Sequence, residues 1–79
     1  MFINITLEVD DRTSDIRIDS EQKINMGLII LRESGKMPPG AMPAYFRSKQ
    51  SEKLVSAYKT FQDESIYDGD ILTAITTKH

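Results

Sequence analysis

The 79-residue sequence lacks cysteine entirely, and it contains a single histidine, His79. Without cysteine the chain has no disulfide bonds, thiol chemistry or thiolate metal sites, which is usual for a cytosolic protein. No apolar run approaches the roughly 20 residues of a transmembrane helix. Residues 1–11 also lack the basic segment and apolar block of a signal peptide. We therefore expect a cytoplasmic protein that does not insert directly into a membrane.

The residues needed for catalysis are scarce as well. His79 stands at the end of the sequence, where nothing orients it as the base of a Ser-His-Asp set. Asp68 and Asp70 flank a glycine in a turn predicted to be solvated, an environment that does not make a carboxyl group a general acid. Residues 63–68 lack the ligand pattern of a calcium loop, and no Gly-Lys-Ser/Thr of a P-loop follows Gly40. We expect no enzymatic activity, no metal site and no cofactor.

The charges are nearly balanced but unevenly distributed. The net charge of −2, from 10 basic and 12 acidic residues, argues against nucleic acid as the main partner. Residues 8–21 carry six acids and two arginines, a net charge of −4, whereas residues 36–59 carry five bases and one acid, a net charge of +4. Residues 63–70 add four acids and no base. These segments form either ordinary solvated loops or a dipolar surface that orients a charged partner.

Alternating apolar residues near the N-terminus predict two strands. The positions on one side of residues 2–9 are Ile3, Ile5, Leu7 and Val9. A period of two with β-branched residues is typical of a half-buried strand. Residues 10–14 are polar and can form a turn. Residues 15–19 alternate again with Ile16 and Ile18 inward, so this part of the chain predicts a β-hairpin.

The apolar period then changes from that of a strand to that of a helix. The spacing i, i+4, i+7 is followed by Ile24, Leu28 and Leu31. With Gly27 beside them, these residues form one face of a helix. Either Asp19 or Ser20 is the type of residue that caps its start.

All three prolines lie in one decapeptide, residues 34–43, SGKMPPGAMP. Gly35 occupies the position at which a helix of about three turns needs a left-handed residue. Pro38 and Pro39 then prevent the helix from continuing. A proline-rich ligand for another protein is the alternative, but with Pro43 these prolines form no P-x-x-P pair. The segment therefore predicts a stiff connector.

The second half of the sequence predicts short strands and an irregular segment. Strands are expected at residues 44–47, 54–55 and 71–75, with turns at residues 48–52 and 68–70. Phe61 and Ile66 are predicted to be buried anchors of the irregular residues 60–67, and Leu72 and Ala74 to face the core. The first and last strands are the most regular, so we expect them in the centre of the sheet, with the helix packed across it.

The sequence resembles ubiquitin-like β-grasp domains over nearly its whole length, and two blocks of residues carry the resemblance. The first consists of Ile24, Leu31 on the same helix face, the Gly35 stop and Met37-Pro38-Pro39. The second consists of Thr60-Phe61-Gln62-Asp63, then Ile66 and Leu72, where ubiquitin-like folds have T-L-x-D-x-x-I and the last strand. The resemblance implies an α+β fold with a mixed four- to five-stranded sheet and one helix packed across it. We expect residues 1–75 to form this single domain and residues 76–79 to form a short polar tail.

The small size and the ending Ile66-Tyr-Asp-Gly-Asp-Ile-Leu72 most resemble the YukD/EsaB family, small cytosolic accessory proteins of the bacterial type VII secretion system. Conjugated ubiquitins and sulfur carriers end in Gly-Gly, because an activating enzyme must close around a tail without side chains. This sequence instead ends Ile75-Thr-Thr-Lys-His79. The departure implies a ubiquitin-like fold used for binding without conjugation, as in YukD/EsaB.

The outer face of the predicted helix is one candidate binding surface. Three sizeable apolar residues point away from its buried side, namely Met26, Ile29 and Ile30. They form either a docking or dimerisation face, or a surface covered by residues 34–43 or 56–67.

The open side of the sheet is the second candidate. Alternation places on it Phe2, Arg17, Tyr45, Arg47, Ile71 and Ile75. Ubiquitin-like domains commonly bind partners on this face, so the resemblance favours it. The alternative is that these are the scattered exposed apolar residues of an ordinary protein surface.

The resemblance implies a non-conjugated adaptor or regulator of the type VII secretion system, which exports small WXG-type substrates. Its expected partners are cytosolic domains of the type VII membrane complex, or a second copy of the chain. The alternative is a free-standing ubiquitin-like binding module, or the accessory subunit of an unrelated enzyme or complex. Neighbouring genes for WXG-type substrates and an FtsK-like membrane ATPase would distinguish these functions.

Overall fold

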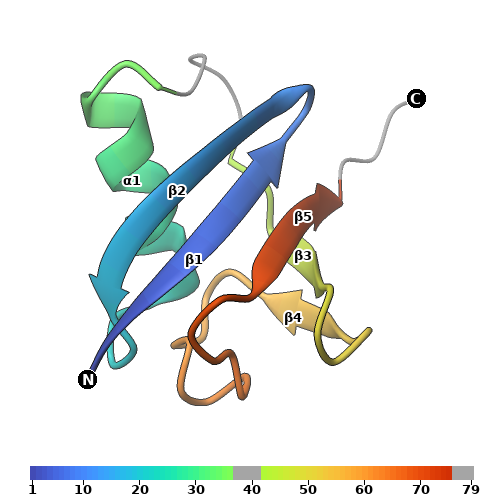
Figure 1. Cartoon of the computed structure of the whole chain (residues 1–79). Coiled ribbons are helices and arrows are strands. Elements are labelled where there is room, and N and C mark those ends of the chain that lie inside the picture. Colours follow the sequence, from blue (N-terminus) through green and yellow to red (C-terminus); the bar gives the residue numbers. More distant parts are fainter. Residues whose placement is uncertain (37–41, 76–79) are drawn as a thin grey trace.

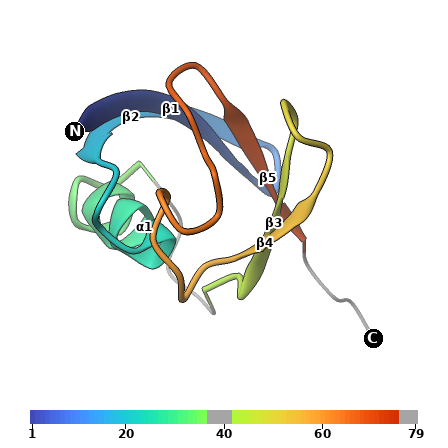
Figure 2. The same ribbon diagram turned by 90° about the horizontal axis from the view of Figure 1, so that it is seen from below.

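The computed structural model describes residues 1–36 and 42–75, which form a five-stranded sheet and one helix (Figure 1). The elements in chain order are β1 (Phe2–Val9), β2 (Arg12–Asp19), α1 (Ile24–Glu33), β3 (Tyr45–Ser48), β4 (Leu54–Ser56) and β5 (Ile71–Ile75). The sheet is curved, and the helix packs on its concave side (Figure 2). The predicted α+β architecture is confirmed.

The strand order in the sheet is β2-β1-β5-β3-β4. The first and last strands of the chain therefore lie inside the sheet, as predicted from their regular alternation. β1 and β5 are parallel, with Thr6 opposite Ile71. The other three pairings are antiparallel.

β1 and β2 form a hairpin that stays paired up to the Val9–Arg12 pair. The predicted turn over residues 10–14 is wrong in length, because only Asp10 and Asp11 separate the strands. Asp10 has a φ of 54°. A positive φ at the first of two turn residues is typical of the primed hairpin turns, whose twist matches that of the paired strands.

The helix α1 buries the face that its spacing predicts. Its buried residues are Ile24, Gly27, Leu28 and Leu31. A Cβ atom at Gly27 would lie 2.7 Å from Cδ1 of Ile16 and 3.3 Å from Cδ1 of Leu7. The glycine thus allows the helix to approach β1 and β2 closely.

The start of α1 is satisfied by backbone groups distant in the sequence. Lys23 is the N-cap residue and makes no side-chain cap bond, so the predicted capping by Asp19 or Ser20 is wrong. The N–H groups of the first two helical residues instead donate to the carbonyl groups of Lys59 and Ala57, each at 2.9 Å. These bonds also hold the segment after β4 against the helix.

The end of α1 follows the prediction for Gly35, which has a φ of 74°. Its N–H donates to the carbonyl of Arg32 at 3.1 Å, and the N–H of Lys36 donates to that of Leu31 at 2.9 Å. This pair of bonds is the Schellman motif that a left-handed glycine permits. The two adjacent prolines predicted to stiffen the connector lie outside the described residues.

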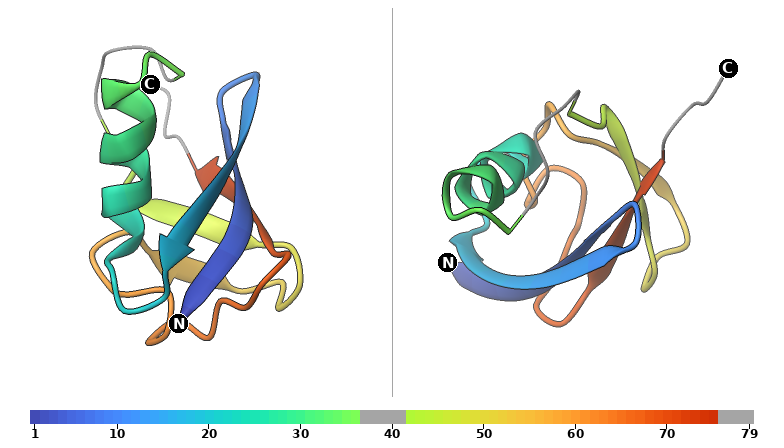
Figure 3. Two further views of the ribbon diagram at one scale, coloured as in Figure 1. Left: turned by 60° about the vertical axis from the view of Figure 1, so that its left-hand side comes forward. Right: turned by 90° about the horizontal axis from the view of Figure 1, so that it is seen from above.

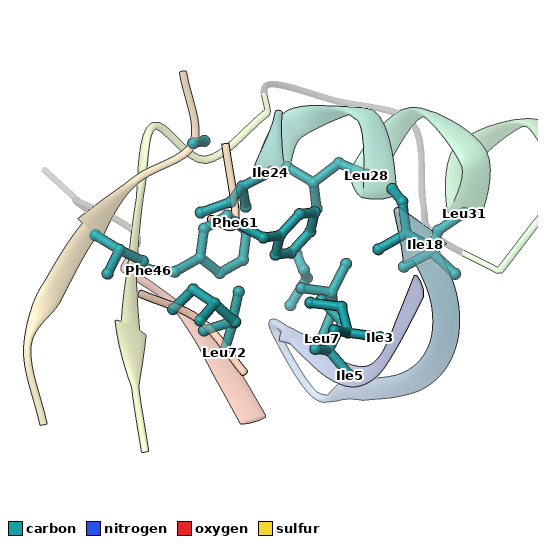
Figure 4. Packing of buried hydrophobic residues seen from close by; sticks show 14 residues of the cluster. Ile3, Ile5, Leu7, Ile18, Ile24, Leu28, Leu31, Phe46, Phe61 and Leu72 are labelled. Atoms are coloured by element: carbon teal, nitrogen blue, oxygen red, sulfur yellow. The ribbon is translucent and has the colours of Figure 1, made fainter. Parts of the chain in front are cut away.

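The hydrophobic core lies between α1 and the sheet (Figure 4). Its largest fully buried apolar residues are Phe46, Phe61, Ile5, Leu7, Ile24, Leu28, Ile66 and Leu72. The predicted burial of Phe61 and Ile66 is therefore confirmed. The N–H of Ile66 donates to the carbonyl of Phe61 at 2.8 Å, which closes the irregular segment between these two anchors. Ala74 is partly buried against the same core.

Asp70 is buried, although the sequence predicts a solvated turn there. The residue is only 1% exposed. Its carboxylate accepts hydrogen bonds from the Ser48 hydroxyl, from the N–H of Gln50 at 3.0 Å and from the N–H of Ile71 at 2.7 Å. The prediction is correct for Asp68, which is exposed. It is wrong for Asp70 because the end of β3, the loop after it and the start of β5 supply donors that compensate its burial.

Candidate functional site

The open face of the sheet is built from side chains that alternate with the core residues. In β3, Phe46 is buried while Tyr45 and Arg47 are exposed. In β4, Val55 is buried while Leu54 is exposed. The face opposite the helix therefore carries the exposed members of each strand.

Four of these residues come together where β5, β3 and β4 lie side by side. Tyr45 is paired with Ile75 on β5, and Arg47 is paired with Leu54 on β4. We refer to Tyr45, Arg47, Leu54 and Ile75 as the sheet-face patch. Tyr45, Leu54 and Ile75 are 50%, 55% and 40% exposed. The patch thus combines one phenol ring, one guanidinium group and two aliphatic side chains in contact with solvent.

Leu54 is a member of the patch that the sequence-based prediction missed. The residue belongs to a strand of only three residues, which is too short for a clear alternating pattern. Leu54 directly precedes Val55 in the predicted strand, so a buried Val55 would have indicated an exposed Leu54 on the open face. Its pairing with Arg47 became visible only with the register of β3 and β4.

Arg47 is held at the edge of the patch by the neighbouring loop. Its Nη1 atom donates to the carbonyl oxygen of Glu52 at 3.3 Å. On its other side Arg47 is paired with Thr73, whose hydroxyl donates to Oε1 of Glu8 at 2.7 Å. The patch therefore ends in a polar border that includes one carboxylate.

Phe2 and Arg17 lie at a different corner of the open face. The guanidinium carbon of Arg17 is 5.6 Å from the centre of the Phe2 ring, a cation–π geometry. In the parallel pair of β1 and β5, Thr6 lies opposite Ile71. Phe2 precedes Thr6 by four residues on β1, and Ile75 follows Ile71 by four residues on β5. With a rise of about 3.3 Å per residue, Phe2 and Ile75 are therefore about 26 Å apart along the strand direction. The structure therefore splits the six predicted residues, with the half-buried Ile71 between the two groups.

A groove adjoins Phe2 at this second corner. Its lining is mainly apolar and comes from Met1, Phe2, Ile3, Ser20, Gln62, Ile66, Tyr67 and Asp68. Asp68 fixes one wall, since its Oδ1 accepts the backbone N–H of Asn4 at 2.7 Å. The groove and the sheet-face patch are separate features of the molecule.

The same corner contains the single titratable group whose pKa is clearly shifted among the described residues, Asp19. Its carboxylate accepts the N–H of Glu21 at 3.0 Å and the α-ammonium group of Met1 at 3.2 Å. The Glu21 hydrogen bond lowers the pKa of Asp19 most, the ammonium group lowers it further, and desolvation opposes both.

We expect Asp19→Asn to weaken the acid dependence of stability. Because the pKa of Asp19 is lower in the folded than in the unfolded state, its contribution is fully present above an unfolded pKa of about 3.9. It is lost as the pH falls through the folded value. Urea denaturation between about pH 2 and 6 should therefore show a shallower acid limb for the variant. A folded-state pKa of Asp19 at or above the ordinary value, measured by NMR titration, would contradict this assignment.

The helix candidate is only partly exposed. Met26 and Ile30 are exposed, whereas Ile29 is half-buried. The outer face of α1 therefore exposes two of the three predicted apolar residues, Met26 by 36% and Ile30 by 45%.

Neither a metal site nor a membrane span emerges from the part of the chain that the structure describes. Within residues 1–36 and 42–75, histidine, aspartate and glutamate side chains form no group of three that could hold a metal ion. No helix in these residues is long and apolar enough to cross a membrane.

The sheet order β2-β1-β5-β3-β4, with its parallel β1–β5 pair and one helix on the concave side, is that of a ubiquitin-like β-grasp domain. Among solved structures, the chain is similar to the EccD5 ubiquitin-like domain from Mycobacterium xenopi, with 16% sequence identity and a TM-score of 0.57. That match covers 100% of this chain and 98% of the other. The chain is also similar to the ubiquitin of Caldiarchaeum subterraneum, with 12% identity, a TM-score of 0.58 and 100% of both chains covered.

Identities this low show the shared fold, and they confirm the predicted ubiquitin-like β-grasp architecture. No protein-family model matches the sequence. No curated protein matches it either.

Proposed function

We propose that the protein is a non-conjugated ubiquitin-like adaptor of a type VII secretion system, and that it acts by binding a cytosolic domain of the membrane complex. The observation that carries this proposal is the sheet-face patch, in which an aromatic ring and an arginine lie among aliphatic side chains. These residue types contribute most of the binding energy once an interface excludes water. The resemblance to YukD/EsaB and the structural likeness to the EccD5 ubiquitin-like domain support the choice of system.

The charge of the patch indicates what kind of partner surface it fits. Arg47 is the cation of the patch and is paired with Leu54, and Lys49 and Lys53 follow it in the loop between β3 and β4. An apolar partner surface with a carboxylate at its border would therefore complement this side of the domain. One face of a domain this small offers at most about 800 Å² per partner, so the complex should be weak and transient.

A ubiquitin-like binding module with another task is the second candidate. The match to an archaeal ubiquitin has a TM-score of 0.58, against 0.57 for the EccD5 domain. The fold is thus no closer to the secretion component than to a ubiquitin. Neighbouring genes for WXG-type substrates and an FtsK-like ATPase remain the observation that separates the two functions.

The double substitution Tyr45→Ala and Arg47→Ala tests the patch. Both side chains are exposed, so the free energy of unfolding should change by less than about 1 kcal/mol. Loss of two central contacts should lower the affinity for the membrane component by about 30-fold or more. Secretion of the WXG-type substrates should fail in cells that carry only this variant.

The matched control is Tyr58→Ala with Lys59→Ala. This pair removes another exposed tyrosine and a base from the segment after β4, which is hydrogen-bonded to the start of α1. It should leave binding and secretion unchanged. If the Tyr45 and Arg47 variant folds, binds and supports secretion like the wild type, the sheet-face patch is not the site.

A further inference from the structure

One edge of the sheet is long and has neither a proline nor a bulge. β2 lies at this edge and runs for eight residues, whereas β4 at the other edge has only three. The β2 sequence RTSDIRID contains no proline, and its pairing with β1 has no bulge. Proteins usually blunt exposed edges with short strands, prolines, bulges or charged side chains, because free N–H and C=O groups can pair with another strand. β4 is blunted by its short length, whereas β2 has only charged side chains, two of each sign: Arg12, Asp15, Arg17 and Asp19.

The backbone groups that face this edge can be identified from the pairing. The N–H of Thr6 donates to the carbonyl of Asp70 on the β5 side, at 3.0 Å. Asp15 is the β2 residue opposite Thr6. Since residues of an antiparallel pair alternate in hydrogen bonding, Asp15 turns its own N–H and C=O away from β1. The same holds two residues away on each side, at Thr13 and Arg17.

We propose that two copies of this chain dimerise through β2, paired antiparallel about a two-fold axis at Ile16. This register places Asp15 opposite the partner's Arg17, and Arg17 opposite the partner's Asp15. Each of these pairs exchanges two backbone hydrogen bonds, and its opposite charges attract across the strands. The two sheets then form one continuous sheet with the same surface used by both copies, as a two-fold interface requires.

The charges select this register over its neighbours. An axis at Asp15 would set two carboxylates opposite one another, and an axis at Arg17 would set two guanidinium groups opposite one another. Like charges that face each other across strands are destabilising. Registers centred further along the strand overlap fewer residues of β2. An axis at Ile16 therefore combines near-complete overlap with complementary charges.

The two charged side chains are available for this contact. Both are exposed, and within the described residues neither forms an ion pair inside the monomer. The carboxylate of Asp15 accepts the Thr6 hydroxyl at 2.6 Å, which orients it and leaves its other oxygen to accept a further bond. The guanidinium carbon of Arg17 lies 5.6 Å from the centre of the Phe2 ring, and within the described residues no hydrogen bond uses its N–H donors.

Apolar residues beside the edge favour the same contact. Ile16 is only partly buried, and it lies against Gly27 of α1. Ile30 is one turn beyond Gly27 on the helix, and it is 45% exposed. Figure 3 shows α1 beside the β2 edge. In the dimer Ile16 meets the partner's Ile16 as a closely spaced, non-hydrogen-bonded pair, which covers apolar surface that the monomer leaves in water.

A contact through one edge strand is small, below about 1,200 Å² in total, so the dimer should be weak and dependent on concentration. Sedimentation velocity of the full chain should show reversible monomer–dimer exchange in the micromolar to millimolar range. The amide hydrogens of Thr13, Asp15 and Arg17 should exchange with solvent more slowly as concentration rises. This edge is distant from the sheet-face patch, so dimerisation leaves the patch exposed and does not depend on the proposed function.

Charge reversal provides the decisive test. Asp15→Arg and Arg17→Asp should each fold, because both positions are exposed, and each should weaken the dimer about tenfold or more by facing like charges across the axis. An equimolar mixture of the two variants should dimerise again, since one carries two positive and the other two negative side chains at these positions. The controls Asp63→Arg and Lys53→Asp change the net charge equally at distant exposed positions and should leave self-association unchanged.

Three results would overturn the proposal. One is a wild-type protein that stays monomeric at about millimolar concentration, the range where the weakest specific contacts are populated. The second is a mixture of the two variants that associates no better than either variant alone. The third is a pair of controls that weakens the dimer as much as the reversals do, which would show that only net charge matters.

Discussion

Replacing Phe61 with alanine should lower the free energy of unfolding by about 3–5 kcal/mol, the usual range for a buried aromatic residue. The Phe61 side chain is 0% exposed, and its ring lies beneath α1, where its Cζ would be 3.8 Å from a Cβ added at Gly27. A domain of this size has a total stability of roughly 4–12 kcal/mol. In a urea titration followed by circular dichroism, the variant should therefore unfold at a much lower urea concentration than the wild type.

Tyr67→Ala is the matched control for this experiment. Tyr67 lies in the same irregular stretch before β5, but its side chain is 66% exposed. Its loss should change stability by less than about 0.5 kcal/mol. A cost below about 1 kcal/mol for Phe61→Ala would show that the irregular segment is not anchored by this ring.

Asp70→Ala should destabilise the protein by about 2–4 kcal/mol, because it leaves buried donors without an acceptor. The Ser48 hydroxyl and the N–H groups of Gln50 and Ile71 all donate to this carboxylate. Together they fasten the β3–β4 loop to the start of β5. Amide exchange at Gln50 should accelerate in the variant along with the loss of global stability.

Asp68→Ala removes the same charge two residues away and serves as the control. Its carboxylate also accepts hydrogen bonds, from the backbone and side-chain nitrogens of Asn4. These bonds are exposed, so water replaces them and the cost should stay below about 1 kcal/mol. Equal costs for the two substitutions would mean that the burial of Asp70 does not matter.

The regular elements could be predicted from the sequence because their signals are local. The alternation of residues 2–9 and the helical spacing of Ile24, Leu28 and Leu31 each follow from the geometry of one element. Gly35 was predictable for the same reason, since a helix end needs a left-handed residue at one position. The first residues of β2 were missed because Arg12 to Ser14 are polar, and only the short turn keeps them paired.

The features that could not be predicted depend on contacts between distant segments. Burial of Asp70 is tolerated because Ser48, at the end of β3, and Gln50, in the loop after it, provide donors. The start of α1 needs no capping side chain because the carbonyl groups of Lys59 and Ala57 accept its first N–H groups. Neither compensation leaves a pattern in the neighbouring residues.

The candidate binding site shows the same division. Alternation correctly placed Tyr45, Arg47 and Ile75 on the open face, because side chains of a strand point to opposite sides in turn. Their grouping with Leu54, and their separation from Phe2, follow from the strand order and register, which join segments far apart in the sequence.

We propose that this ubiquitin-like domain binds the type VII membrane complex through the sheet-face patch. The most direct measurement is an NMR titration of the ¹⁵N-labelled protein with a cytosolic domain of that complex from the same genome. Binding at the patch predicts chemical-shift changes centred on Tyr45, Arg47, Leu54 and Ile75, and the loss of these changes in the variant with Tyr45→Ala and Arg47→Ala. Chemical-shift changes confined to α1 or to the groove beside Phe2 would contradict binding at the patch. So would the absence of any change at a partner concentration of about 1 mM, since the weakest specific contacts have dissociation constants in this range.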